Sequence, residues 1–226
     1  TVPYDAPAIA LEGAHLYVGE RLLLPDVNLS VPEGSHVVIN GASGSGKSTL
    51  LRVLAGFPPP EKGQLLINGS VVTPTNRNLL RRRIAYVPQT PQLTQGVTVM
   101  EYLKEPLSYR SNSGTSFSDR HIEAKAEALR LPPSLLLQTT DQLSGGERHR
   151  LMLLRGILLN RRIFLLDELS GSLDAASRSA ALASLDAGGA TVVSVSHDEN
   201  WLARSDYRYE IRAARLEAVS LESVVS

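Results

Sequence analysis

The sequence has 226 residues, 42% hydrophobic and 20% charged, which is typical of a folded globular protein and excludes a disordered chain. Its 23 basic and 23 acidic residues balance, so the net charge indicates neither a nucleic acid nor a membrane surface as partner. The absence of cysteine excludes disulfides and thiolate chemistry, and no apolar run approaches the roughly 20 residues of a membrane-spanning helix. Residue 1 is Thr, so we expect a trimmed start or a chain cut from something longer.

Residues 8–88 form a strand-rich first block. Strand patterns cover residues 22–24, the alternating apolar positions 27, 29 and 31, and residues 36–40. Residues 65–72 predict a hairpin, because the Asn68-Gly69 pair accepts the positive φ angles of a tight turn.

The rest of the chain has a different pattern. Residues 89–143 hold a serine-rich stretch at 108–118 and a helical pattern at 119–129, which ends before Pro132-Pro133 because proline cannot continue a helix. Residues 144–226 alternate helices and strands, at 144–159, 163–166, 174–185 and 191–196. This alternation predicts an α/β fold in which crossover helices join a parallel sheet. We expect one domain, residues 1–226, with residues 89–143 as a helical insertion.

A glycine-rich loop follows the strand at 36–40 and opens an apolar helix. The loop reads Gly41, Ala42, Ser43, Gly44, Ser45, Gly46, Lys47, Ser48 and Thr49. Its glycines let backbone amides close around a phosphate, and the following helix directs its positive dipole end at the anion. Lys47 reaches the β and γ phosphates, and the Ser48 hydroxyl binds Mg²⁺. The pattern fixes four positions, which Gly41, Gly46, Lys47 and Ser48 occupy. A chance match to all four occurs in under roughly 1% of chains this size, so the loop predicts nucleotide binding.

Two acids follow the apolar strand at 163–166. Ligands gather at the carboxyl ends of parallel strands, so Asp167 is predicted to hold Mg²⁺ through water. Glu168 is predicted to polarise the water that attacks the γ phosphate. The alternative is an ordinary strand end with solvated acids, and the phosphate loop favours the first interpretation.

The helix at 144–159 opens with an unusual pair of glycines. Ser144 as N-cap and Glu147 three residues later form a capping box. Gly145 and Gly146 each cost the helix about 1 kcal/mol relative to Ala. We therefore predict that the glycines let backbone amides approach a second anion-binding position.

Together these residues resemble the ATP-binding-cassette (ABC) family of ATPase domains, over residues 11–211. The matching motifs are Walker A (41–49), the Q-loop Gln89, the LSGGE signature (143–147), Walker B (163–168), the D-loop Asp174 and the switch-loop His197. Tyr17 is placed like the aromatic that stacks on adenine. The resemblance implies a P-loop fold with a mainly parallel core sheet, an N-terminal antiparallel β region and an inserted helical subdomain.

The resemblance also implies a mechanism, with ATP and Mg²⁺ as cofactors. ATP lies between Walker A of one cassette and the signature of another, so we expect a head-to-tail homodimer. By resemblance, Glu168 is the base, and Ser48, Asp167 and Gln89 surround Mg²⁺. Lys47 and His197 contact the phosphates of the nucleotide bound by their own chain. The signature residues contact the nucleotide bound by the second cassette, in trans; they are Ser144, Gly145, Gly146 and Glu147.

Alternatives remain open for single residues. Tyr17 also fits a strand-edge aromatic and His197 a structural histidine. Residues 81–83 are three arginines, which we interpret as a solvated face rather than a nucleic-acid contact. Residues 169–174 depart from the family's Pro-Thr-Ser-Ala-Leu-Asp, and Gly171 is predicted to loosen this loop.

The implied function is to bind and hydrolyse ATP for an ABC transporter. The partner is then a membrane permease or a fused membrane domain, and the chain sits in the cytoplasm at the inner face of the membrane. The turn after Gln89 and residues 101–110 resemble small bacterial ATPases of metal-ion export. The alternatives are a soluble assembly ATPase, for example of the iron–sulfur type, and a nucleotide-sensing switch, which the presence of Glu168 and His197 disfavours.

Overall fold

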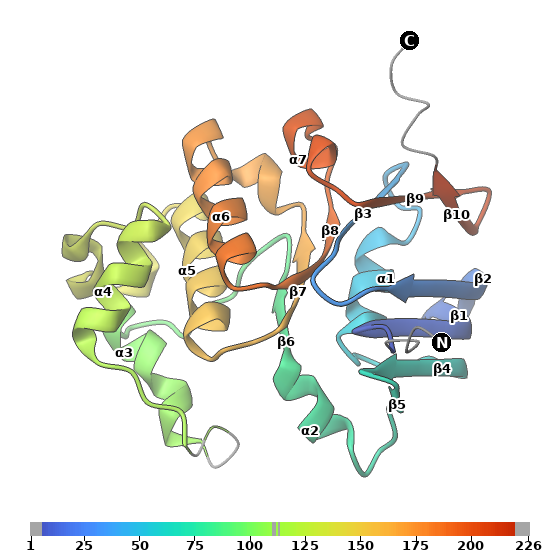
Figure 1. The fold of residues 1–226 in the computed structure, drawn as a ribbon, viewed down its shortest axis with the longest axis horizontal. Helices are drawn as coiled ribbons and strands as arrows, with labels where there is room; N and C mark the ends of the chain where they lie inside the picture. Colours follow the sequence, from blue (N-terminus) through green and yellow to red (C-terminus); the bar gives the residue numbers. More distant parts are fainter. Residues whose placement is uncertain (1–5, 110–111, 113, 220–226) are drawn as a thin grey trace, which may run out of the picture.

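The computed structural model describes residues 6–109, 112 and 114–219, which form two sheets with helices around them (Figure 1). The first sheet has the order β2-β1-β4-β5 and the second the order β10-β9-β3-β8-β7-β6. Within the described residues, no helix is both long enough and apolar enough to cross a membrane.

The first sheet is antiparallel. Its strands are β1 (Ile9–Val18), β2 (Arg21–Val31), β4 (Lys62–Ile67) and β5 (Ser70–Val71). β4 and β5 form the predicted hairpin, and its turn residues Asn68 and Gly69 have φ angles of 47° and 71°. Pro25 lies in β2, an edge strand, where a missing amide hydrogen costs no ladder bond.

The second sheet is mainly parallel. Its strands are β3 (His36–Gly41), β6 (Ile84–Val87), β7 (Ile163–Asp167), β8 (Thr191–Val195), β9 (Tyr207–Arg212) and β10 (Arg215–Val219). Five of them run parallel, and β10 pairs antiparallel with β9. Every residue of β7 and β8 is buried, as expected for strands covered on both faces. The α/β prediction with an antiparallel N-terminal region is confirmed.

The helices follow the predicted pattern where they are long. They are α1 (Lys47–Leu54), α2 (Arg77–Leu80), α3 (Val99–Lys104), α4 (Asp119–Ala128), α5 (Gly145–Leu158), α6 (Ala175–Ala187) and α7 (Glu199–Ala203). α4, α5 and α6 confirm the helices predicted from the sequence. α2, α3 and α7 have four to six residues, which is too short to show a helical period in the sequence.

Two hydrophobic clusters build the core. One lies between the two sheets around α1, and the other joins the opposite face of the parallel sheet to α3, α4, α5 and α6 (Figure 1). The parallel sheet separates the clusters, so its carboxyl edge is held rigidly from both faces.

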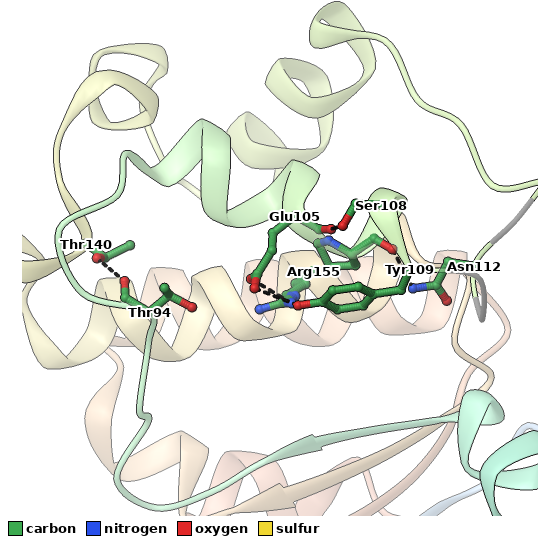
Figure 2. Close-up of polar contacts among 8 residues, drawn as sticks. Thr94, Glu105, Ser108, Tyr109, Asn112, Thr140 and Arg155 are labelled. Carbon is green, nitrogen blue, oxygen red and sulfur yellow. Dashed lines mark hydrogen bonds and ion pairs between the residues drawn. The ribbon is translucent and has the colours of Figure 1, made fainter.

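A polar contact joins the helical segment after β6 to α5 (Figure 2). The Arg155 guanidinium on α5 lies 3.3 Å from a Glu105 carboxylate oxygen and 4.3 Å from the centre of the Tyr102 ring. The other Glu105 oxygen accepts a 2.6 Å hydrogen bond from the Tyr109 hydroxyl. Thr140 Oγ1 donates to the Thr94 carbonyl at 2.6 Å. The Arg155 contacts hold the helical segment against α5, the helix that carries the signature.

Candidate functional site

The loop between β3 and α1 requires glycine at three positions. Gly41, Gly44 and Gly46 have φ angles of 147°, 75° and 111°, which side-chain-bearing residues rarely adopt. A Cβ at Gly41 would lie 2.9 Å from the Ile211 carbonyl oxygen, and one at Gly46 would lie 2.8 Å from the Leu23 side chain. Close packing around the loop therefore fixes its curvature.

Lys47 is the first residue of α1, and its ammonium group lies over this loop. Only 8% of the residue is exposed. Its Nζ donates to the carbonyl oxygens of Gly41 at 2.7 Å and Ala42 at 3.0 Å. These two bonds hold a buried positive charge where the helix dipole adds to it, so the position attracts an anion.

Asp167 ends β7 and is 2% exposed. Its Oδ1 accepts a 3.1 Å hydrogen bond from Ser48 Oγ, and its Oδ2 accepts a longer one, 3.4 Å, from the Tyr86 hydroxyl. Burial raises the pKa of Asp167, while these two hydrogen bonds act in the opposite direction. Burial and the nearby Asp167 raise the pKa of Tyr86 to about 12.

Oxygen donors of this kind suit Mg²⁺. The hydroxyl of Ser48 and the carboxylate of Asp167 are hard ligands, which Mg²⁺ prefers. Among the described residues, no cluster of three or more His, Cys, Asp or Glu side chains is arranged to hold a metal ion. A divalent cation here would therefore need further oxygens, from phosphate groups and water.

A cavity of about 390 Å³ lies over the loop. The expected residues among those that line it are Ser43, Gly44, Gly46, Lys47, Ser48, Thr49, Gln89 and Glu168. Ala42 and Ser45 line a neighbouring hollow instead. The structure thus brings together residues separated by more than a hundred positions in the sequence.

Glu168 is directed away from the strand that precedes it. It adopts the left-handed conformation, with φ 55° and ψ 28°, which is uncommon for a residue with a side chain and clusters at functional sites. Its Oε1 lies 3.7 Å from Nε2 of His197. Glu168 lines the cavity and His197 does not; the Glu168 side chain is 26% exposed and that of His197 57%.

The loop that carries His197 is anchored on both sides. The preceding Ser196 is fully buried, and its Oγ lies 2.7 Å from Ser170 Oγ in η6 (Leu169–Ser172). The Asp198 amide donates to the same Ser196 oxygen at 3.0 Å. Asp198 also caps α7 and forms an ion pair with Arg178.

The D-loop residue Asp174 is the N-cap of α6. It accepts a 2.7 Å hydrogen bond from the Ser177 amide, and this bond lowers the pKa of Asp174. Upstream, Gly171 lies in η6 with a φ outside the left-handed region, and a Cβ there would meet no atom within 4 Å. Neither turn geometry nor packing requires glycine at this position, and the loosening of the loop stays a prediction.

The signature segment opens α5 with the expected capping box. Ser144 Oγ and its amide donate to Glu147 Oε2 at 2.6 and 2.8 Å. A Cβ at Gly146 would lie 2.8 Å from the Ser172 carbonyl oxygen, whereas one at Gly145 would meet nothing within 4 Å. Packing within the chain therefore explains Gly146 but not Gly145. Neither glycine lines the cavity over the Lys47 loop.

A protein-family model for the ABC transporter matches residues 24–171. This chain belongs to the ABC transporter family. The sulfate/thiosulfate import ATP-binding protein CysA of Synechocystis is 35% identical over 196 residues, covering 85% of this chain and 54% of that protein. The "Probable iron export ATP-binding protein FetA" of Escherichia coli is 32% identical over 176 residues, covering 77% of this chain and 76% of that protein.

A solved cassette has the same fold. It is a dimeric ATP-binding cassette in a post-hydrolysis state bound to ADP and Pi, 27% identical, with a TM-score of 0.80, covering 94% of this chain and 99% of that one. The ABC type of fold inferred from the sequence is confirmed. The chain spans about half the length of the CysA relative.

Gly41, Asp167 and His197 are not among the residues that line the main cavity, and neither is Tyr17, the residue expected to stack on adenine. Tyr17 lines an adjacent hollow of about 270 Å³ that shares Val18 and Thr49 with it. Val18 and Arg21, on either side of the β1–β2 turn, line the main cavity instead. The sequence analysis missed both, because their place depends on how the antiparallel sheet packs against the Lys47 loop.

The two signature glycines of the cassette give a matched pair of substitutions. Gly146→Ala is expected to lower the free energy of unfolding by about 1–3 kcal/mol, because its methyl group overlaps the Ser172 carbonyl. Gly145→Ala is expected to leave the thermal unfolding midpoint unchanged or slightly raised. If Gly145 serves a second cassette, the same change still lowers ATP hydrolysis at least about tenfold. A Gly145→Ala protein with full activity would contradict the role in trans.

Proposed function

We propose that the chain binds and hydrolyses ATP to drive transport through a membrane partner. The observation that carries this proposal is the single cavity that brings Lys47, Ser48, Gln89 and Glu168 together. In this cavity Lys47 would contact phosphate, Ser48 and Gln89 would contact the metal, and Glu168 would contact the attacking water. We also propose that residues 1–226 act as one domain, in which 89–143 are a helical insertion between Walker A and the signature.

The nucleotide is bound through its phosphates. The amides of residues 41–46, the α1 dipole and the Lys47 ammonium offset the phosphate charge. Ser48, Gln89 and, through water, Asp167 would hold Mg²⁺, which would neutralise charge on the phosphates. Tyr17, in the hollow next to the main cavity, is the proposed contact for adenine.

Hydrolysis requires that the attacking water and the γ phosphate are held in position and that a base accepts a proton from the water. Glu168 accepts a proton as the oxygen of a water molecule attacks the γ phosphorus and the bond to ADP breaks. Its left-handed backbone aims the carboxylate at the cavity, and the 3.7 Å contact keeps His197 beside it. His197 donates a hydrogen bond to the γ phosphate, which holds the group in line for attack.

The complete site needs a second cassette. Within the chain, Ser144, Gly145 and Glu147 lie apart from the cavity over Lys47, and no packing reason is found for Gly145. We propose that two copies pair head to tail, so that the signature and Asp174 of one copy face the nucleotide of the other. The dimeric ADP-bound cassette supports the pairing of two copies.

Coupling to transport is supported by the relatives, one named for import and one for export. The partner is then a membrane permease or a fused membrane domain, and the chain lies at the cytoplasmic face of the membrane. The export relative is matched over 76% of its length. This supports metal-ion export as the proposed direction and substrate class.

Homodimer formation can be tested by measuring how the hydrolysis rate per chain depends on protein concentration. We expect Mg-ATP hydrolysis per chain to rise with protein concentration until dimers saturate, and EDTA to abolish it. Phosphate release measured over a dilution series gives the result. A rate per chain that is independent of concentration, from a protein that stays monomeric, would overturn the shared site.

A further inference from the structure

The short helix α7 follows the switch loop and is anchored by one aromatic side chain. Of its five residues, Trp201 is the buried one, with 1% of the residue exposed. Trp201 packs in the same hydrophobic cluster as Leu182 and Leu185 of α6. A helix this short is not stable on its own in water, so the way in which Trp201 is held decides where α7 lies.

A buried polar network holds the Trp201 ring. The indole Nε1 of Trp201 donates a 2.9 Å hydrogen bond to Oγ of Ser194 on β8. Nε2 of His36, at the start of β3, lies 2.9 Å from the same oxygen. The His36 and Trp201 rings also meet edge to face, with their centres 5.8 Å apart. One serine oxygen therefore connects two strands and a helix.

The network is shielded from water and carries no charge. Ser194 and Trp201 are each 1% exposed, and His36 is also buried. Burial lowers the pKa of His36 to about 4, against the opposing effect of Asp206 and Asp186, so the ring is neutral at pH 7. A polar group that loses its partner in such a place costs free energy, so these groups keep one another in position.

His197 lies within the loop that this network closes. Ser194 and Trp201 are seven positions apart in the sequence, and His197 lies between them. Asp198, the next residue, is tied to α7 as well, because its Oδ1 accepts a 3.0 Å hydrogen bond from the Trp201 amide. Closing a short loop restricts its conformations. The Ser194–Trp201 bond therefore limits the positions that the His197 backbone can take.

Hydrophobic burial alone does not explain a tryptophan at this place. Any large apolar side chain would fill the space without bringing an N–H group into the core. The indole N–H is accommodated because Ser194 accepts its hydrogen bond. Buried polar contacts with all partners present favour one arrangement over others. His36 precedes the Walker A loop and Trp201 follows the switch loop, so neither belongs to a motif found in the sequence.

We propose that Trp201, through its buried bond to Ser194, is a positioning residue that holds His197 toward the γ phosphate. This rests on the contact between His197 and the γ phosphate in the proposed function. The His197 side chain is 57% exposed, so little packing holds it and its position follows the backbone on either side. Trp201 is buried behind the loop and acts through His197 rather than on the nucleotide itself.

The rate of hydrolysis tests the bond directly. Trp201→Phe keeps an aromatic ring beside His36 and removes the N–H that binds Ser194. We expect kcat for Mg-ATP hydrolysis to fall about 2- to 12-fold, which is the range for the loss of one hydrogen bond. The affinity for Mg-ADP, which has no γ phosphate, is expected to stay unchanged.

A matched variant at the other end of the same strand serves as control. Thr191 Oγ1 accepts a 2.8 Å hydrogen bond from the Gly34 amide, and Thr191 is 1% exposed. Thr191→Val keeps the shape of the side chain and removes this bond. It is expected to lower the thermal unfolding midpoint and to leave kcat unchanged, because Thr191 lies at the end of β8 away from the switch loop.

Binding gives a second readout that needs no hydrolysis. In the Glu168→Gln background, the ratio of the Mg-ADP to the Mg-ATP dissociation constant measures the contact with the γ phosphate. Trp201→Phe is expected to lower this ratio at least about twofold, and His197→Ala to lower it by at least as much. The variant with both changes is expected to have the ratio of His197→Ala alone, because Trp201 acts through His197.

Three results would overturn the proposal. These are a folded Trp201→Phe protein with wild-type kcat, an equal loss of kcat in Thr191→Val, and a ratio that falls further when Trp201→Phe is added to His197→Ala. If Trp201→Phe fails to fold, Ser194→Ala removes the same bond from the other side and is held to the same expectations. A wild-type chain that binds ATP without hydrolysing it would remove the proposed function, whereas the binding ratios would still decide the role of Trp201.

Discussion

Glu168→Gln is expected to lower the rate of ATP hydrolysis by roughly 10²–10⁴-fold while Mg-ATP binding is kept. Gln has the same shape as Glu and fits the left-handed position at the mouth of the cavity. It cannot accept a proton from water, so only the chemical step loses its base. Single-turnover phosphate release measures the rate, and nucleotide titration measures the binding.

The same variant reports on assembly. With hydrolysis blocked, the ATP-bound dimer is expected to accumulate, and light scattering with and without Mg-ATP distinguishes it from the monomer. Glu199→Gln, just after the switch loop in the first turn of α7, serves as control and is expected to hydrolyse ATP normally. Retained turnover in Glu168→Gln would exclude Glu168 as the base. A variant that binds ATP tightly and stays monomeric would exclude the homodimer.

Lys47→Ala is expected to reduce ATP affinity about 10- to 150-fold. The ammonium is the buried positive charge over the phosphate loop, and a hydrogen bond to a charged group contributes about 1.5–3 kcal/mol. The substitution also removes the bonds to the carbonyl oxygens of Gly41 and Ala42, so the loop loses part of its support. Titration with a fluorescent ATP analogue gives the affinity.

Two controls separate binding from folding in this experiment. Lys125→Ala removes an exposed lysine from α4 and is expected to bind ATP as the wild type does. The thermal unfolding midpoint of Lys47→Ala shows whether the protein remains folded. Unchanged ATP affinity in a folded Lys47→Ala protein would contradict the proposed role of the ammonium.

Most of the site could be predicted from the sequence because its parts sit at the ends of strands. β3 leads into the phosphate loop, β7 ends at Asp167 and β8 leads to His197. The carboxyl ends of parallel strands meet at one edge of a sheet. The Ser144–Glu147 capping box depends only on local spacing, and it too was predicted correctly.

Other features depend on tertiary contacts that no local pattern carries. β9 lies inside the sheet between β10 and β3, although its sequence is mostly polar and half-buried. The close contact that requires Gly146 involves a carbonyl 26 positions away in the sequence, that of Ser172.

The short segment η6 touches two other loops at once. The Ser172 carbonyl leaves no room for a side chain at Gly146, and Ser170 shares a buried hydrogen bond with Ser196. Movement of η6 must therefore either displace the start of α5 or break a hydrogen bond in the dry interior, which is costly. The start of α5 and the loop at Ser196, next to His197 in the chain, are thus both in direct contact with η6. We expect a displacement of η6 toward either neighbour to be passed on to it.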